Sequence, residues 1–144
     1  MKHMEPRISL VTLGVIDLPR VRAFYEALGW TAAASSNAQI TFFNLGGTGL
    51  ALFPRPLLAM DAKVDYSQPQ AFNGTALAQN VESEARVDEV LQVAVAAGAT
   101  ILKPAEKTFW GGYSGVFADP ENNIWEIAHN PGFPLDDDGR ITIP

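Results

Sequence analysis

Apolar and polar positions along the first third of the chain predict a strand, a helix and three further strands. Residues 8–15 are apolar and rich in β-branched side chains, which indicates a buried strand. Asp17 is suited to cap a helix, and Gly29 is suited to end it. Three strand-like segments follow, over residues 30–34, 39–45 and 49–53. Between the two helix signals, apolar side chains recur at helical spacing: Val21, Phe24, Tyr25 and Leu28.

The same order of elements is predicted a second time farther along the chain. A strand over residues 75–81 is followed by a helix that Ser83 caps and Gly98 ends. Strands are expected at residues 100–102, 115–118 and 124–130. Val15 and Asp17 correspond to Val81 and Ser83 at a constant offset (81 − 15 = 83 − 17 = 66), and the second helix is expected to run about one turn longer. Such repetition is typical of paired modules, neither of which buries its sheet face alone.

Prolines mark a linker between the two repeats. Pro54, Pro56 and Pro69 bracket a stretch without clear periodicity, in which a short helical turn at residues 61–66 is left open. We therefore expect one α+β domain over residues 7–131, with module one at 7–55, a linker at 56–73 and module two at 74–131. Residues 132–144 are expected to form a polar tail. Its sequence Asp136-Asp137-Asp138-Gly139 lacks the later glutamate of a calcium loop, so it predicts a solvated turn.

Composition and charge exclude several classes of function. The chain is 47% hydrophobic and 18% charged, as in ordinary globular proteins, and it contains no cysteine. Disulfides, thiolate metal sites and cysteine nucleophiles are therefore excluded. The net charge of −6 argues against nucleic acid as a partner, since phosphate binding needs clustered cations. No signal peptide is recognisable after Met1, and no window approaches the roughly 20 apolar residues that cross a bilayer, so a cytoplasmic location without a membrane partner is expected.

Two motifs flank the repeat and resemble those of a known superfamily. Residues 11–18, VTLGVIDL, lead into Phe24-Tyr25 and Leu28-Gly29-Trp30 and resemble the opening of a vicinal-oxygen-chelate module. Residues 119–126, DPENNIWE, resemble the Asp-Pro-Asp-Gly-Asn segment and closing strand of such proteins. Over residues 7–131 the chain is thus similar to glyoxalase I, bleomycin-resistance proteins and extradiol dioxygenases. The resemblance implies two tandem βαβββ modules that form a U-shaped half-barrel sheet, with the helices outside and the ligand site on the concave face.

The resemblance also implies where a metal ion would be bound. Metal-using members supply four ligands from the concave face, and these positions fall on Leu10, Ala51, Ala76 and Glu126. Alkyl side chains cannot coordinate a metal, so only Glu126 retains a ligand atom. The separation of His129 from Glu126 is odd (129 − 126 = 3), so strand alternation places His129 on the opposite face. We therefore expect neither a metal ion nor another cofactor.

Glu126 has two interpretations. On a concave and partly apolar face, it is a candidate general acid or base. Alternatively, it is an ionised carboxylate that is hydrogen-bonded at the end of a strand and serves the structure.

Aromatic residues supply the remaining candidates for a ligand site. Residues 108–115, TFWGGYSG, carry Phe109, Trp110 and Tyr113 around two adjacent glycines, as expected of a loop that presents aromatic rings to a cavity. The alternative is a β-hairpin whose aromatic side chains cap the core. Phe42 and Phe43 are adjacent in one predicted strand, so one faces the helices and the other faces the concave side.

These features together predict a metal-independent protein that binds a small apolar or cationic molecule, similar to bleomycin-resistance proteins. Two enzymatic alternatives remain open: a glyoxalase- or dioxygenase-like enzyme whose metal ligands lie elsewhere, and a metal-free enzyme that uses Glu126 as its base. A homodimer is expected, because the open edges of a half-barrel sheet need a cover. The expected ligand-binding residues are Leu10, Phe42, Phe43, Ala51, Ala76, Phe109, Trp110 and Tyr113.

Overall fold

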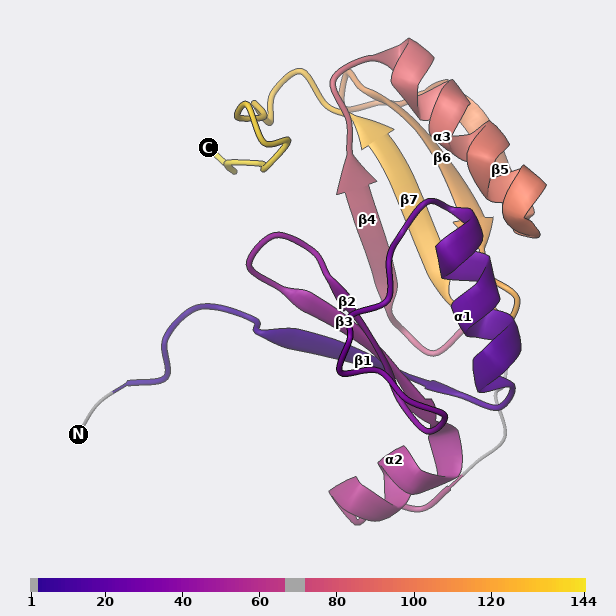
Figure 1. The fold of residues 1–144 in the computed structure, drawn as a ribbon. Helices are drawn as coiled ribbons and strands as arrows, with labels where there is room; N and C mark the ends of the chain where they lie inside the picture. The colour runs from indigo at the N-terminus through magenta and orange to yellow at the C-terminus, as the bar shows by residue number, and fades with distance from the viewer. Residues whose placement is uncertain (1–2, 67–71) are drawn as a thin grey trace. The chain divides into compact units, whose positions relative to one another are not determined.

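The chain divides into two compact units, which are Met1–Pro69 and Gln70–Pro144. The structure is a computed structural model that describes residues 3–66 and 72–144. No helix in these two ranges is long and apolar enough to cross a membrane. Each unit contains its own sheet and its own long helix (Figure 1).

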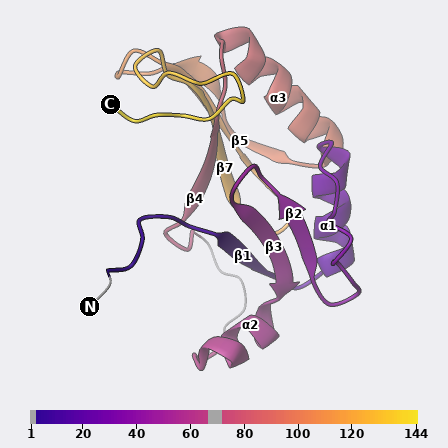
Figure 2. The ribbon, with the colours of Figure 1, turned by 60° about the vertical axis from the view of Figure 1, so that its left-hand side comes forward.

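The first unit has a three-stranded sheet in the order β1-β3-β2. Strand β1 runs parallel to β3, and β2 runs antiparallel to β3, so the first and last strands of the unit lie side by side (Figure 2). The elements of this unit are β1 (Leu10–Val15), α1 (Leu18–Ala27), β2 (Thr41–Asn44), β3 (Gly49–Pro54) and α2 (Arg55–Ala62).

The second unit has a four-stranded sheet in the order β4-β7-β6-β5. Its first and last strands, β4 and β7, are again parallel neighbours, and the other pairs are antiparallel. Helix α3 lies along one face of this sheet (Figure 1). The elements are β4 (Ala76–Asn80), α3 (Glu84–Ala97), β5 (Thr100–Lys107), β6 (Tyr113–Ala118) and β7 (Ile124–His129).

The internal repeat is confirmed by the two helix starts. The Asp17 carboxylate accepts a hydrogen bond from the Arg20 amide at 3.2 Å, and the Ser83 hydroxyl accepts one from the Arg86 amide at 3.0 Å. These two N-caps stand at the predicted offset, and each satisfies an amide that the first helical turn leaves without a partner. Helix α3 has 14 residues and α1 has 10, so α3 is longer by about one turn. The predicted α+β architecture of two βαβββ-type units is therefore confirmed.

The strand expected at residues 30–34 is reduced to one bridge, between Ala32 and Phe43. The Ser36 hydroxyl explains why the pairing stops there. It accepts a hydrogen bond from the Phe42 amide at 2.9 Å and also lies 3.5 Å from the Phe42 carbonyl oxygen. A side chain thus occupies the position that a neighbouring strand would take beside β2, and the chain turns away after the bridge.

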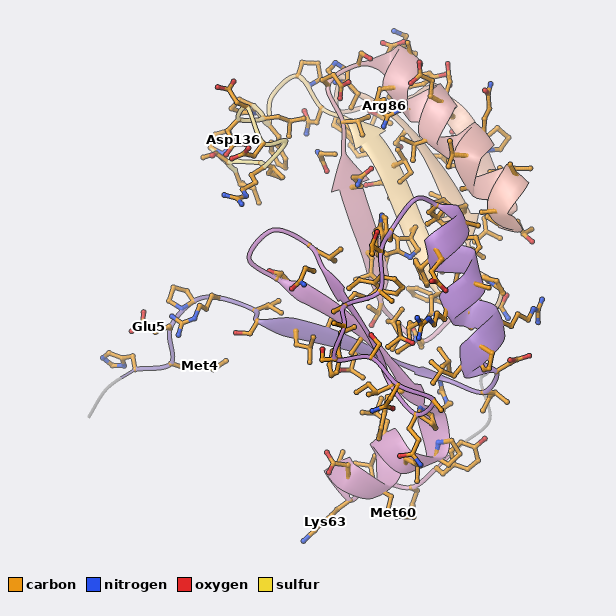
Figure 3. The ribbon with its side chains drawn as sticks, in the orientation of Figure 1. Met4, Glu5, Met60, Lys63, Arg86 and Asp136 are labelled. Carbon is orange, nitrogen blue, oxygen red and sulfur yellow. The ribbon has the colours of Figure 1, made fainter. Side chains whose placement is uncertain are left out.

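Residues 55–62 form helix α2, although the sequence placed most of them in the linker. Pro56 lies in the first helical turn, where its missing N–H costs no hydrogen bond, so this proline starts a helix rather than preventing one. The helix ends at Lys63, which adopts a left-handed conformation with φ 57°. Met60 and Lys63 point away from the sheet of this unit (Figure 3). Part of the predicted linker, residues 67–71, lies outside the described residues.

The tail at residues 132–144 contains a small closed turn. The Asp136 carboxylate accepts hydrogen bonds from the Asp138 and Arg140 amides, both at 2.9 Å. Leu135 and Ile141 form an antiparallel bridge that closes the turn. The acidic segment therefore uses a carboxylate oxygen to hold its own backbone, as expected of a solvated turn.

Candidate functional site

In the second unit, alternation along the strands separates a helix face from a far face, the latter defined as the face directed away from the long helix. A side chain at Gly115 would collide with Leu91 of α3, which fixes the helix face of β6. Ile127 pairs with Gly115 in the register and therefore faces α3, whereas Glu126 lies on the far face. The predicted position of Glu126 on the face opposite the helix agrees with this geometry.

Glu126 lies in a row of side chains that crosses the far face of the second sheet. Its register partners are Ala78 on β4 and Val116 on β6, and Val116 in turn pairs with Lys103 on β5. Lys103 lies 3.8 Å from Glu106, so this lysine already has an acidic neighbour on its own strand. The row thus places the carboxylate of Glu126 between the small Ala78 and the apolar Val116, with Lys103 at its end.

The Glu126 carboxylate is half-buried and forms no hydrogen bond or ion pair with any described residue. The interpretation of Glu126 as a hydrogen-bonded structural carboxylate therefore has no support in the described residues. Its surroundings on the far face are mostly methyl groups, because four alanines share this face: Ala76, Ala78, Ala118 and Ala128. A carboxylate in such surroundings is suited to accept a hydrogen bond or a positive charge from a bound molecule.

In the first unit, aromatic contacts identify the two faces. Phe43 is 2% exposed, and its ring centroid lies 6.0 Å from that of Tyr25 on α1, so Phe43 belongs to the core beneath the helix. Its neighbour Phe42 is half-buried and lies on the far face, in a row with Thr12 and Ala51. The sequence did not decide which of the two adjacent phenylalanines faces away from the helix, and the structure shows that it is Phe42.

The repeat relates the far faces of the two units position by position. The constant offset carries Leu10 to Ala76 and Thr12 to Ala78 (76 − 10 = 78 − 12 = 66). Ala51 pairs with Thr12, and Glu126 pairs with Ala78, so Ala51 is the equivalent of Glu126. All four positions that the superfamily uses for metal ligands therefore lie on far faces.

These four positions do not fit a divalent metal ion. Leu10, Ala51 and Ala76 offer no ligand atom, and Ala51 is fully buried. Within residues 3–66 and 72–144, no group of three or more histidine or acidic side chains is placed to hold a metal. His129 lies on the α3 side of the sheet, where its Nδ1 is 3.1 Å from the Val81 carbonyl oxygen.

The aromatic segment between β5 and β6 forms a tight hairpin turn. The Thr108 amide donates to the Gly112 carbonyl at 3.0 Å, and the Gly112 amide donates to the Thr108 hydroxyl at 3.0 Å. Gly111 has φ +88°, which favours glycine there, and the ring of Trp110 occupies the space that a side chain at Gly112 would need. The geometry of the turn therefore explains why glycine stands at both positions.

The three aromatic side chains of this segment are not gathered into one cluster. Phe109 is fully exposed and Trp110 is 39% exposed. The Tyr113 hydroxyl donates to Asp88 of α3 at 2.7 Å, which places Tyr113 on the helix face and not on the face of Glu126. A role for Phe109 and Trp110 in binding stays a prediction.

The contact with Asp88 raises the pKa of the Tyr113 phenol above its ordinary value, mainly because Asp88 accepts the phenolic proton in a hydrogen bond. The contact stabilises the folded chain below the ordinary phenol pKa, and this stabilisation is lost as the pH rises through the raised value. We expect Asp88→Ala to lower the pKa of Tyr113, measured by NMR of the tyrosine ring carbons. Glu84→Gln should change it much less, because Glu84 acts only through its more distant charge. An unchanged pKa in Asp88→Ala would show that the hydrogen bond is absent in solution.

A pocket of about 430 Å³ opens on the far face of the first unit, beside the β2–β3 turn. Its wall includes two candidates from the sequence, Leu10 and Phe42, so the structure brings these two together. Its polar side chains were missed by sequence reasoning: Ser9, Ser35, Asn44 and Thr48. Strand alternation could have identified Asn44 as a candidate. Asn44 is the second residue after Phe42 in β2, so the two side chains lie on the same face.

Solved structures of other proteins share this fold. The chain is 36% identical to a glyoxalase-related enzyme from Fulvimarina pelagi, with 96% of this chain and 99% of that chain covered and a TM-score of 0.87. A glyoxalase/bleomycin resistance protein/dioxygenase family enzyme from Burkholderia phytofirmans PsJN is 25% identical, with coverages of 84% and 96% and a TM-score of 0.70. Lactoylglutathione lyase from Agrobacterium tumefaciens is 23% identical, with coverages of 88% and 95% and a TM-score of 0.65, which shows a common fold alone. No curated protein matches the chain.

A family model gives the classification directly. Residues 7–127 match the model of the Glyoxalase/Bleomycin resistance protein/Dioxygenase superfamily. The matched range spans both units and includes both motifs that flank the repeat. The chain therefore belongs to the Glyoxalase/Bleomycin resistance protein/Dioxygenase superfamily.

Proposed function

We propose that this chain binds a small organic molecule on the far face of a sheet and does so without a metal ion. The observation that carries the proposal is the chemistry at the four superfamily ligand positions. Leu10, Ala51 and Ala76 have no atom that binds a metal, so Glu126 is the single position with a ligand atom. A divalent ion held by one carboxylate would keep most of its water shell and would bind weakly. Two of these alkyl groups, Leu10 and Ala76, are exposed and instead give apolar surface for an organic ligand.

Glu126 supports a ligand that carries a hydrogen-bond donor or a positive charge. Its half-buried carboxylate has no partner among the described residues, and its register partner Ala78 is exposed. A ligand that donates to this carboxylate would satisfy its acceptor capacity and cover the methyl groups around it.

A metal-free enzyme is the second candidate, favoured by the same carboxylate. Glu126 would then remove a proton from a carbon next to a carbonyl group, as a general base. The 36% identical protein from Fulvimarina pelagi is described as a glyoxalase-related enzyme, which supports a catalytic role for this chain. Formation of lactoylglutathione that requires Glu126, but not added metal, would distinguish this enzyme from a binding protein.

We expect the purified chain to contain far less than one divalent metal ion per molecule, measured by elemental analysis. Added Zn²⁺, Ni²⁺ or Mn²⁺ should leave the melting temperature unchanged. A specific ion at about 100 times its Kd would instead stabilise the fold by about 2.7 kcal/mol, because it binds only the folded state. Glu126→Gln should behave like the parent chain in this assay. A metal that raises the melting temperature of the parent chain but not of Glu126→Gln would overturn the metal-free proposal.

A further inference from the structure

The pocket beside the β2–β3 turn has no charged side chain in its wall. None of its ten lining residues is acidic, basic or a histidine. Its volume of about 430 Å³ lies within the range of small-molecule sites. The wall therefore offers no counter-charge to a charged group, so its hydrogen-bonding side chains favour a neutral group of the same shape.

Three polar side chains of this pocket are exposed and remain available to a ligand within the described part of the chain. The carboxamide of Asn44 and the hydroxyls of Ser9 and Ser35 form no hydrogen bond with any described residue. Thr48 differs from them, because its hydroxyl donates to the Ile8 carbonyl at 3.0 Å and keeps only its acceptor capacity. The pocket therefore offers both donors and acceptors, and the carboxamide of Asn44 offers both at one site.

Two apolar side chains shape the pocket for a flat group. The ring of Phe42 is half-buried on the far face, and its backbone is held by the two contacts with the Ser36 hydroxyl. Leu10 lies across Gly49, since a side chain at that glycine would stand 2.9 Å from the Leu10 Cδ1 atom. A half-buried ring in a pocket wall presents apolar surface on which a planar group stacks.

From these contacts we propose that the pocket binds an uncharged planar group that both donates and accepts hydrogen bonds, of the carboxamide or lactam class. The planar part stacks on Phe42, and the amide pairs with the carboxamide of Asn44. The inference rests on the proposed function, because it assigns a chemical class to a ligand that the far face of the first unit binds. It differs from the role of Glu126, which would recognise a donor or a positive charge.

Benzamide, benzoate and benzamidine provide a direct test, because they share one ring and differ in charge. Each is titrated into the full chain while backbone and side-chain amide signals are followed by NMR. Benzamide should shift the side-chain amide signals of Asn44 and the backbone signals of Thr48 and Gly49. Benzoate and benzamidine should bind this pocket at least about tenfold more weakly, since each forfeits an amide hydrogen bond and finds no counter-charge in the wall.

Variants of Asn44 separate its hydrogen bonds from its shape. Asn44→Leu should weaken the binding of benzamide by about tenfold. Asn44→Asp should make the pocket prefer benzamidine over benzamide. Gln92→Leu is the matched control and should leave benzamide binding unchanged, because Gln92 lies on α3 of the other unit. The spectrum of each variant also reports whether it remains folded.

The pattern of shifts distinguishes the two proposals. Shifts of Ala78, Val116 and Glu126 with benzamidine, together with an unaffected Asn44 pocket for benzamide, would support the proposed function and overturn the carboxamide pocket. Equal binding of all three probes beside Asn44 would overturn it as well. If no probe at millimolar concentration perturbs either far face, both proposals are wrong.

Discussion

Phe43→Ala is expected to lower the free energy of unfolding by about 3–5 kcal/mol, the usual cost of removing a buried aromatic side chain. The Phe43 ring lies 5.6 Å from the ring of Trp30 and 6.0 Å from that of Tyr25, so its loss leaves a cavity among aromatic rings. The rigid strand backbone and the large neighbouring rings limit collapse into that cavity. Urea unfolding, followed by tryptophan fluorescence and circular dichroism, measures the change.

Phe42→Ala is the matched control, because the two residues are neighbours in β2 with side chains on opposite faces. Phe42 is only half-buried, so its truncation should cost less than about 1.5 kcal/mol. Phe42→Ala should nevertheless weaken benzamide binding, whereas the main effect of Phe43→Ala should be a lower free energy of unfolding. Equal losses of stability in the two variants would show that the faces of β2 are assigned wrongly.

Asp119→Ala is expected to destabilise the chain by about 2–4 kcal/mol, since each polar group left unsatisfied away from water costs about 1–3 kcal/mol. Asp119 is 3% exposed and holds the turn between β6 and β7. One carboxylate oxygen accepts from the Glu121 and Asn123 amides, both at 2.9 Å, and the other accepts from the Asn123 side-chain amide at 2.8 Å. Alanine removes all three hydrogen bonds at once. Thermal and urea unfolding both measure the loss.

Asp119→Asn provides the comparison that separates hydrogen bonding from side-chain volume. An asparagine oxygen still accepts from the two backbone amides, and only the contact with the Asn123 side chain becomes unfavourable. We expect its loss of stability to be about half that of Asp119→Ala. If alanine and asparagine are tolerated equally, the two backbone amides are satisfied by water, and the turn does not depend on the carboxylate.

The sequence was sufficient for the repeat because each helix start has a local chemical signature. Asp17 and Ser83 accept hydrogen bonds from amides three residues onward, a geometry fixed within one turn of the chain. The face of the sheet on which Glu126 lies could also be predicted, since neighbouring residues of a strand point to opposite faces. These local rules placed His129 and Glu126 on different faces without knowledge of the strand order.

Contacts between distant segments were beyond the sequence. The hydrogen bond from Tyr113 to Asp88 joins residues 25 positions apart and sets the face on which Tyr113 lies. The Ser36 hydroxyl ends the pairing beside β2, which the apolar pattern of residues 30–34 does not reveal. Pro56 was misread because the same residue that breaks the interior of a helix is favoured in its first turn. The polar pocket wall near Asn44 likewise depends on a turn and a loop that meet only in the folded unit.

The parallel pairing of first and last strands fixes an order of events during synthesis. Strand β1 starts at Leu10, and its parallel partner β3, which starts at Gly49, is synthesised later. In the same way, β4 starts at Ala76 and pairs with β7, which starts at Ile124. Pairing between segments so far apart in the sequence is slow compared with helix formation, so α1 and α3 can form before either sheet closes. The first sheet can close once residue 54 has left the ribosome, whereas the second needs residue 129. A pause in translation between α3 and β7 leaves β4 without its neighbour, an open strand edge available to other nascent chains.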